Sequence, residues 1–260
     1  DRRTGFVLVA AIMVIIIGSV TAMYMAGRHY AASFVFAQSL AQISEGTSLD
    51  EVEAGISNAY NLYQSDVYAR QVAQYQIARM NALLQVAEPT TEQQQQFQSA
   101  VANGVNAAQV AVSQDGSDAA NHAVLGAVYS AVAAAGIEGA YDRAKEAFAE
   151  ARALAPNNPA YLFAEARLES QNGDLEAARA LIEEAIRLRP RFTEAVFFLS
   201  QLDVAAGDIP AAIETTLATV RLEPNNPTRY YQLGVLYSSN EQLTESIAAF
   251  ERAVELDANF

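Results

Sequence analysis

Residues 5–26 are apolar on every side, whereas the later residues repeat apolar positions with the period of an α-helix. This uncharged run of 22 residues would form a helix of roughly 33 Å at about 1.5 Å per residue. That length matches the hydrocarbon core of a bilayer. The pattern therefore predicts a transmembrane anchor helix over residues 1–28, with residues 5–26 in contact with the membrane.

Two other kinds of apolar helix fit this run less well. A secretory signal has a shorter apolar run followed by a small-x-small cleavage site, and the sequence has neither feature. A core helix usually keeps one polar face, which residues 5–26 lack. Arg2 and Arg3 precede the run and Arg28 follows it, so the positive-inside rule predicts a cytoplasmic N-terminus and a periplasmic or extracellular remainder.

The spanning helix is expected to continue beyond the membrane. No helix breaker follows the apolar run until Gly46, so the same helix should enter the first helix pair of the folded part. A continuous helix would make the junction between anchor and folded part rigid.

The second half of the chain repeats with a period of 34 residues. Pro156, Pro190 and Pro224 lie 34 residues apart, and the string Pro-Asn-Asn-Pro occurs at 156–159 and again at 224–227. When 159–192, 193–226 and 227–260 are aligned, small or apolar residues share columns. Examples are Leu162/Val196/Tyr230, Ala166/Ser200/Gly234 and Ala178/Ala212/Ser246. Small residues at such fixed places indicate helices that approach each other closely.

These columns resemble the tetratricopeptide repeat (TPR), a 34-residue helix pair. In the last repeat Tyr230, Leu233, Gly234, Tyr237, Phe250 and Ala253 have the spacing of that motif. The resemblance implies an all-α fold, a right-handed α-solenoid of antiparallel helix pairs. It divides the chain into divergent pairs over 29–118 and TPR repeats over 119–158, 159–192, 193–226 and 227–260.

Composition limits the chemistry. The chain has no Cys and two His residues, His29 and His122, so it offers neither a thiolate site nor a His pair at metal-binding spacing. No phosphate-binding glycine loop or Ser/His/Asp set is present. We expect no enzyme activity, no cofactor and no metal site.

Charge argues against nucleic acid as a partner. The net charge is −14, and because the first 40 residues carry +2, the remainder carries −16. Phosphate binding needs a basic surface.

Glu165 and Glu169 lie four residues apart, so they would share one helix face. A catalytic or metal-binding carboxylate pair is one interpretation. Ion pairs with Arg179 or another nearby arginine are the other, and we favour them because structural ion pairs are the commoner arrangement.

An aromatic column offers a candidate binding surface. Phe163, Phe197 and Tyr231 are one period apart on the first helices of successive repeats, and in the TPR fold these helices line the concave surface. The column could hold a protein segment or a glycan. Alternatively, the rings pack between adjacent helices.

Three functions remain open at this stage. The first is a non-catalytic, membrane-anchored TPR scaffold for protein–protein interaction. The second is a surface-filament subunit, because no polar capping helix follows the last repeat and its face with Ile247 and Val254 would need cover, unless further repeats follow. The third rests on a weaker resemblance to the C-terminal TPR tail of bacterial O-antigen-ligase-like membrane proteins, whose catalytic part would lie upstream.

Overall fold

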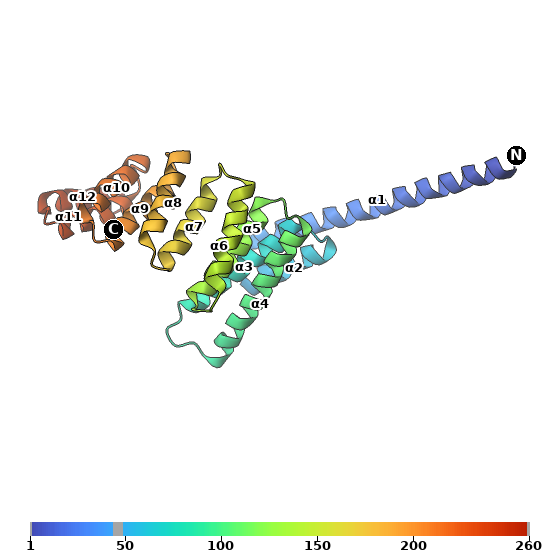
Figure 1. Cartoon of the computed structure of the whole chain (residues 1–260), viewed down its shortest axis with the longest axis horizontal. Helices are drawn as coiled ribbons and strands as arrows, with labels where there is room; N and C mark the ends of the chain where they lie inside the picture. The colour runs from blue at the N-terminus through green and yellow to red at the C-terminus, as the bar shows by residue number, and fades with distance from the viewer. Residues whose placement is uncertain (1, 44–48, 259–260) are drawn as a thin grey trace. The chain divides into compact units, whose positions relative to one another are not determined.

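The structure is a computed structural model that describes residues 2–43 and 49–258. These residues form twelve α-helices and no β-strand (Figure 1). The helices are α1 (Arg2–Ile43), α2 (Leu49–Leu62), α3 (Asp66–Leu84), α4 (Thr91–Gln114), α5 (Ala119–Ala134), α6 (Ala140–Leu154), α7 (Pro159–Gln171), α8 (Leu175–Leu188), α9 (Thr193–Ala205), α10 (Ile209–Leu222), α11 (Pro227–Ser239) and α12 (Leu243–Leu256). The predicted all-α fold is confirmed.

The helices belong to two compact units. One unit comprises residues 1–116 with α1 to α4, and the other comprises residues 117–260 with α5 to α12. In both units each helix packs mainly against its neighbour in sequence, which gives the pairs α1/α2, α3/α4, α5/α6, α7/α8, α9/α10 and α11/α12. Successive pairs in the second unit are joined through α6/α7, α8/α9 and α10/α11.

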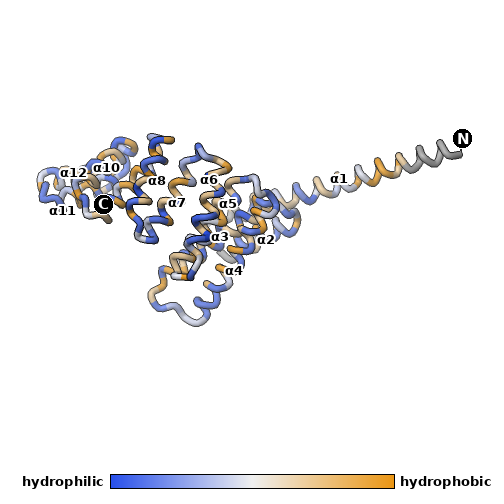
Figure 2. The backbone as a smooth tube through the Cα atoms, in the orientation of Figure 1, coloured by the Kyte–Doolittle hydropathy of each residue, from blue (hydrophilic) through white to orange (hydrophobic). Residues whose placement is uncertain are grey.

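Helix α1 has two different parts. Every residue from Ala11 to Tyr30 is exposed, and the part of the apolar run that begins at Ala11 includes orange stretches of tube in Figure 2. The later part packs on α2, where Ala32 and Ser39 are buried. Gly55 of α2 permits this approach, because a Cβ atom there would lie 1.9 Å from the Ser39 hydroxyl oxygen. The predicted continuation of the apolar helix into the first helix pair is confirmed.

The repeated Pro-Asn-Asn-Pro string starts a helix. The side chain of Asn158 accepts a hydrogen bond from the Ala160 amide, and that of Asn226 accepts one from the Thr228 amide, so both asparagines cap helix N-termini. The final proline of each string is the first helical residue, where its missing N–H costs nothing. The string therefore fixes where α7 and α11 begin.

The turns inside the repeats share one backbone conformation. Gly173 and Gly207, one period apart, have φ of 86° and 77°. Glu241 stands one period further on, at φ 61°, and is the one non-glycine residue with positive φ among the described residues. A left-handed conformation strains a residue with a Cβ atom, so the last turn is the least favourable of the three.

Complementary side-chain sizes close each helix pair. A Cβ atom on Gly126 would lie 2.6 Å from the Phe148 ring, and one on Gly234 would lie 2.7 Å from the Phe250 ring. In the same column of α9 and α10, two small hydroxyl residues meet instead, with 2.8 Å between the oxygens of Ser200 and Thr216. The small column predicted from the sequence is thus the place where paired helices touch.

Candidate partner-binding surfaces

The aromatic column lies on the first helices α7, α9 and α11, and its three members have different surroundings. Phe163 is half-buried, and its ring lies 5.4 Å from that of Phe192 and 5.7 Å from that of Phe198. The Arg229 guanidinium stacks 3.9 Å above the Phe197 ring. Tyr231 is 46% exposed and packs against Phe250, with 5.5 Å between ring centroids.

Phe163 and Phe197 line one hollow of about 370 Å³, which we call the aromatic hollow. Arg167, Gln201 and Arg229 also line it. Tyr231 does not belong to the lining. The structure therefore brings together two members of the sequence column and adds two arginines that the sequence reasoning had not connected with them.

The charge of Arg229 is partly balanced by Glu223, which follows α10 in the preceding repeat. Its Nε donates to Glu223 at 2.8 Å, and the Asn226 amide donates to the same carboxylate oxygen at 2.9 Å. The hydrogen bond from Arg229 lowers the pKa of Glu223. Arg167 is exposed. Glu194 also lines the aromatic hollow. The hollow thus combines rings with two arginines and one glutamate, which suits a segment that carries apolar and charged groups.

Glu165 and Glu169 are both held in ion pairs, but only Glu165 has the arginine partner that the favoured interpretation expected. Glu165 pairs with Arg152 at 3.0 Å, and Glu169 pairs with Lys145 at 2.8 Å. The Tyr141 hydroxyl donates to the second oxygen of Glu169 at 2.6 Å. Arg179, the partner named from the sequence, instead binds Asp203. Among the described residues, no group of three His, Cys, Asp or Glu side chains is placed to hold a metal ion.

Helix α12 has an apolar face open to solvent. Leu243, Ile247 and Val254 are 65%, 59% and 50% exposed. The two residues named from the sequence, Ile247 and Val254, share this face with Leu243, and we call the three residues the α12 face.

Comparison with protein families identifies the repeats. Two family models, both described as tetratricopeptide repeat, match the chain, one at residues 137–191 and 170–234 and the other at 227–260. Residues 137–260 are tetratricopeptide repeats. The predicted TPR solenoid is confirmed, and TPR domains of this kind are scaffolds that bind other proteins.

Solved TPR structures share this fold. The crystal structure of TTC0263, a thermophilic TPR protein in Thermus thermophilus, is 13% identical, covers 79% of this chain and 98% of its own, and superposes with a TM-score of 0.62. Two crystal structures of MamA are 17% and 16% identical, cover 66% and 69% of this chain and 97% and 92% of their own, and give TM-scores of 0.53 and 0.52. A comparison with curated protein sequences found no match.

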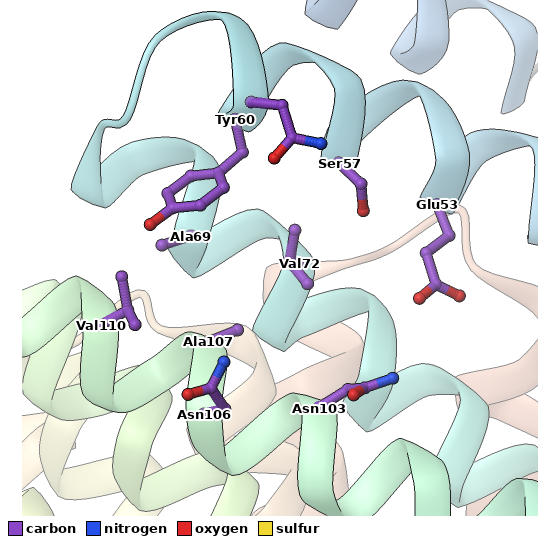
Figure 3. Close-up of a pocket in the computed structure, with 10 residues that line it drawn as sticks. Glu53, Ser57, Tyr60, Ala69, Val72, Asn103, Asn106, Ala107 and Val110 are labelled. Carbon is purple, nitrogen blue, oxygen red and sulfur yellow. The ribbon is translucent and has the colours of Figure 1, made fainter.

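The TPR family models leave α2 to α4 unmatched, and there the structure shows a hollow of about 300 Å³. Figure 3 shows Ser57 of α2 on one side of it and Asn103 and Asn106 of α4 on the other. Asn61 of α2 also lines it. These residues define the α2/α4 hollow.

Sequence reasoning missed the α2/α4 hollow. Asparagine is a poor helix former, so Asn61, Asn103 and Asn106 inside helices were a signal that could have been followed. The signal alone does not say that the three side chains converge, because α2 and α4 are separated by all of α3.

Proposed function

We propose that this chain is a non-catalytic, membrane-anchored TPR scaffold that captures a protein segment on the extracytoplasmic side. The observation that carries the proposal is the exposed apolar part of α1. Within the segment from Ala11 to Ser39, the most apolar window has a mean hydropathy of 1.6, and none of that window is buried in the protein. An apolar helix without a protein partner is stable inside a bilayer, where its backbone groups are bonded within the helix.

Contacts where α1 leaves the apolar run support a rigid anchor. Arg28 donates from Nε to the Leu62 carbonyl at 2.6 Å and from Nη2 to the Asn61 carbonyl at 3.1 Å. These carbonyls end α2, so the arginine supplies both hydrogen bonds and the positive charge that a helix C-terminus favours. His29 packs edge-on against the Tyr63 ring at 4.8 Å. The first residues after the proposed span are therefore fixed to α2.

Partner capture is proposed for the aromatic hollow. Phe163 and Phe197 supply apolar area, and Arg167 and Arg229 supply charge. The exposed Tyr231 would extend the contact beyond the hollow. A protein segment fits this mixture better than a glycan, because guanidinium groups pair most strongly with carboxylates. Binding should therefore weaken at high salt.

Membrane anchoring is tested by extraction and by labelling. The full chain should stay with the membrane fraction in alkaline carbonate, and deletion of residues 1–28 should release a soluble helical protein. Because the chain has no Cys, a single Ser238→Cys variant can be labelled with a membrane-impermeant maleimide. Labelling in intact spheroplasts supports the outward orientation. Extraction of the full chain into the aqueous fraction, with no polymer present, would contradict the anchor.

Partner capture is tested by substitution in the hollow. Phe197→Ala and Tyr231→Ala should weaken binding to a cross-linked partner while leaving the circular dichroism spectrum unchanged. Phe163→Ala is the demanding case, since this ring also packs in the core and its truncation is expected to cost about 3 kcal/mol of stability. Unchanged partner binding by the Phe197→Ala/Tyr231→Ala double variant would refute partner capture at the aromatic hollow and Tyr231.

A second candidate function, assembly into a filament, is favoured by the α12 face. Three exposed apolar side chains on one helix are typical of a surface that another helix covers. Ile247→Glu and Val254→Glu should abolish self-association measured by sedimentation, whereas the control Glu245→Gln on the same helix should not. A monomeric unsubstituted chain in detergent would exclude the filament. The glycan-ligase alternative stays a prediction from the sequence.

A further inference from the structure

We propose that the α2/α4 hollow binds an extended, uncharged protein segment through the segment's main-chain amides. The proposal rests on the proposed function of the chain as a protein-binding scaffold, but it concerns a different site. Its hydrogen-bonding residues come from α2 and α4, the second helices of their pairs, whereas the aromatic hollow is lined by first helices.

The hollow offers hydrogen-bonding groups that the protein itself does not use. The side chains of Ser57, Asn61, Asn103 and Asn106 have no hydrogen-bond partner within the described residues. Each carboxamide presents a donor and an acceptor together, as a peptide group does. Three carboxamides and a hydroxyl that line one hollow can therefore pair with both the N–H and the C=O groups of an extended chain.

The spacing of these groups matches an extended chain. Ser57 and Asn61 are four residues apart on α2, which corresponds to about 6.0 Å along a helix. Alternate residues of an extended chain repeat at about 6.6 to 6.8 Å. In Figure 3 the labelled residues of α2 and α4 follow each other in the same direction along the hollow, with Glu53 near Asn103 at one end and Tyr60 near Val110 at the other. The residues of α2 and those of α4 thus form two parallel rows, and an extended peptide could lie between them.

The length of the path sets the size of the segment. From Glu53 to Asn61 the α2 row rises by eight residue steps, or about 12 Å of helix. Extended chain covers about 3.3 Å per residue, so the hollow accommodates about four residues.

Charge and depth define which segment fits. Both oxygens of Glu53 are engaged, one by the Gln76 amide at 2.6 Å and the other by Arg79 at 3.2 Å. The hollow therefore presents no unpaired charge for an ionic ligand. Its floor contains Ala69, Val72 and Ala107, with Figure 3 showing no long side chain among them. A segment rich in Gly, Ala and Ser lies closest to such a floor.

The same lining disfavours a sugar as the occupant. Sugar faces pack on exposed aromatic rings, and Tyr60 is the one aromatic residue in the lining. Its hydroxyl already accepts a hydrogen bond from Gln114 at 3.4 Å. A glycan would find hydrogen-bonding groups here but little apolar surface on which to stack.

The test uses a capped peptide of Gly, Ala and Ser residues, long enough to fill the hollow, and the full chain in detergent micelles. Nuclear magnetic resonance of the side-chain amides reports directly on Asn61, Asn103 and Asn106. The peptide should shift these signals, and the Asn103→Ala/Asn106→Ala variant should bind at least about tenfold more weakly, because two side chains that hydrogen-bond the peptide are lost. Alanine favours a helix more than asparagine does, so this variant should fold.

Two controls make the result specific. Gln95→Ala/Gln98→Ala removes two carboxamides from the same helix outside the hollow and should bind the peptide normally. A peptide with the same side chains but N-methylated main-chain amides should bind much more weakly.

Three outcomes would overturn the proposal. They are equal binding of the N-methylated peptide, shifts at the hollow with lactose but not with the peptide, and no shift of the three asparagine signals at saturating peptide. Failure of the membrane anchor appears in carbonate extraction and not in this titration, so the two proposals fail separately.

Discussion

The junctions between successive TPR repeats use two different solutions at the same place. At α6/α7 Lys145 pairs with Glu169, and one period later, at α8/α9, Arg179 pairs with Asp203. One further period along, at α10/α11, the equivalent residues are Ile213 and Tyr237, which lie in one apolar cluster. The junction position accepts either an ion pair or an apolar pair.

The residues that stabilise a junction between repeats can differ from those that determine which repeats pack together. Glu169 and Asp203 are 2% exposed at the side chain, so each carboxylate has lost its water and depends on its partners. The apolar pair bears no such cost. Ion pairs at two junctions and an apolar pair at the third would discourage the repeats from packing in the wrong order, since a buried charge tolerates only its own partner.

The largest expected effect is the loss of Arg179. Arg179→Met leaves Asp203 buried with only the Thr215 hydroxyl, which donates to it at 2.5 Å, so the free energy of unfolding should fall by about 3 kcal/mol. Urea unfolding followed by circular dichroism measures the loss. Arg187→Met removes an arginine from a pair that is largely exposed on both sides and should change stability by less than about 0.5 kcal/mol. Equal effects of the two substitutions would refute the role of burial.

Loss of Lys145 should cost less. Glu169 keeps the Tyr141 hydroxyl, and water reaches Lys145, whose side chain is 50% exposed. Lys145→Met should lower the free energy of unfolding by about 1 to 2 kcal/mol. If Lys145→Met destabilises the protein as much as Arg179→Met does, solvent access does not distinguish the two ion-paired junctions.

Copying the apolar junction into α8/α9 tests whether the two solutions are interchangeable. The double variant Arg179→Ile/Asp203→Tyr should lie within about 1 kcal/mol of the original stability, because replacing a buried ion pair by apolar residues is often neutral. The same urea experiment gives the answer. A double variant as unstable as Arg179→Met would show that the ion pair is required at this junction.

The smallest effect concerns Glu165 and depends on pH. Burial raises the pKa of Glu165, and Arg152 opposes the shift only in part. A raised folded-state pKa contributes stability below the ordinary value of 4.5, and this contribution is lost as pH rises through the folded-state pKa. With Glu165→Gln the free energy of unfolding should therefore fall less as the pH rises. At neutral pH the variant should be more stable by up to about 1 kcal/mol. Urea midpoints across the acidic range check it, and an unaltered pH profile would count against the assignment.

Much of this architecture could be read from the sequence, because TPR repeats constrain the residues that lie between helices. The 34-residue period located the tight contacts of Gly234 and Ser200, and the apolar run located the exposed part of α1. These features depend on neighbours one helix away, so spacing along the chain is enough to find them.

The candidate sites were less accessible to sequence reasoning. Tyr231 shares a column with Phe163 and Phe197, yet it lies outside the aromatic hollow. The cause is local: Gly234 lets Phe250 approach α11, and Tyr231 packs against that ring. Ion-pair partners also depend on side-chain reach across helices, which explains why Arg179 belongs to Asp203 and not to Glu165 or Glu169.

Because α1 is continuous, the exposed apolar part of the helix has a fixed rotational orientation relative to the part that packs on α2. Each residue added between the apolar run and Ala32 would turn the docked face of α1 by about 100° and move it about 1.5 Å along the axis. A single insertion after Ala26 would thus rotate α2, α3 and α4 about the helix axis without changing any contact among them. In this arrangement the number of residues in α1 sets the rotational orientation of α2, α3 and α4 about the axis of α1.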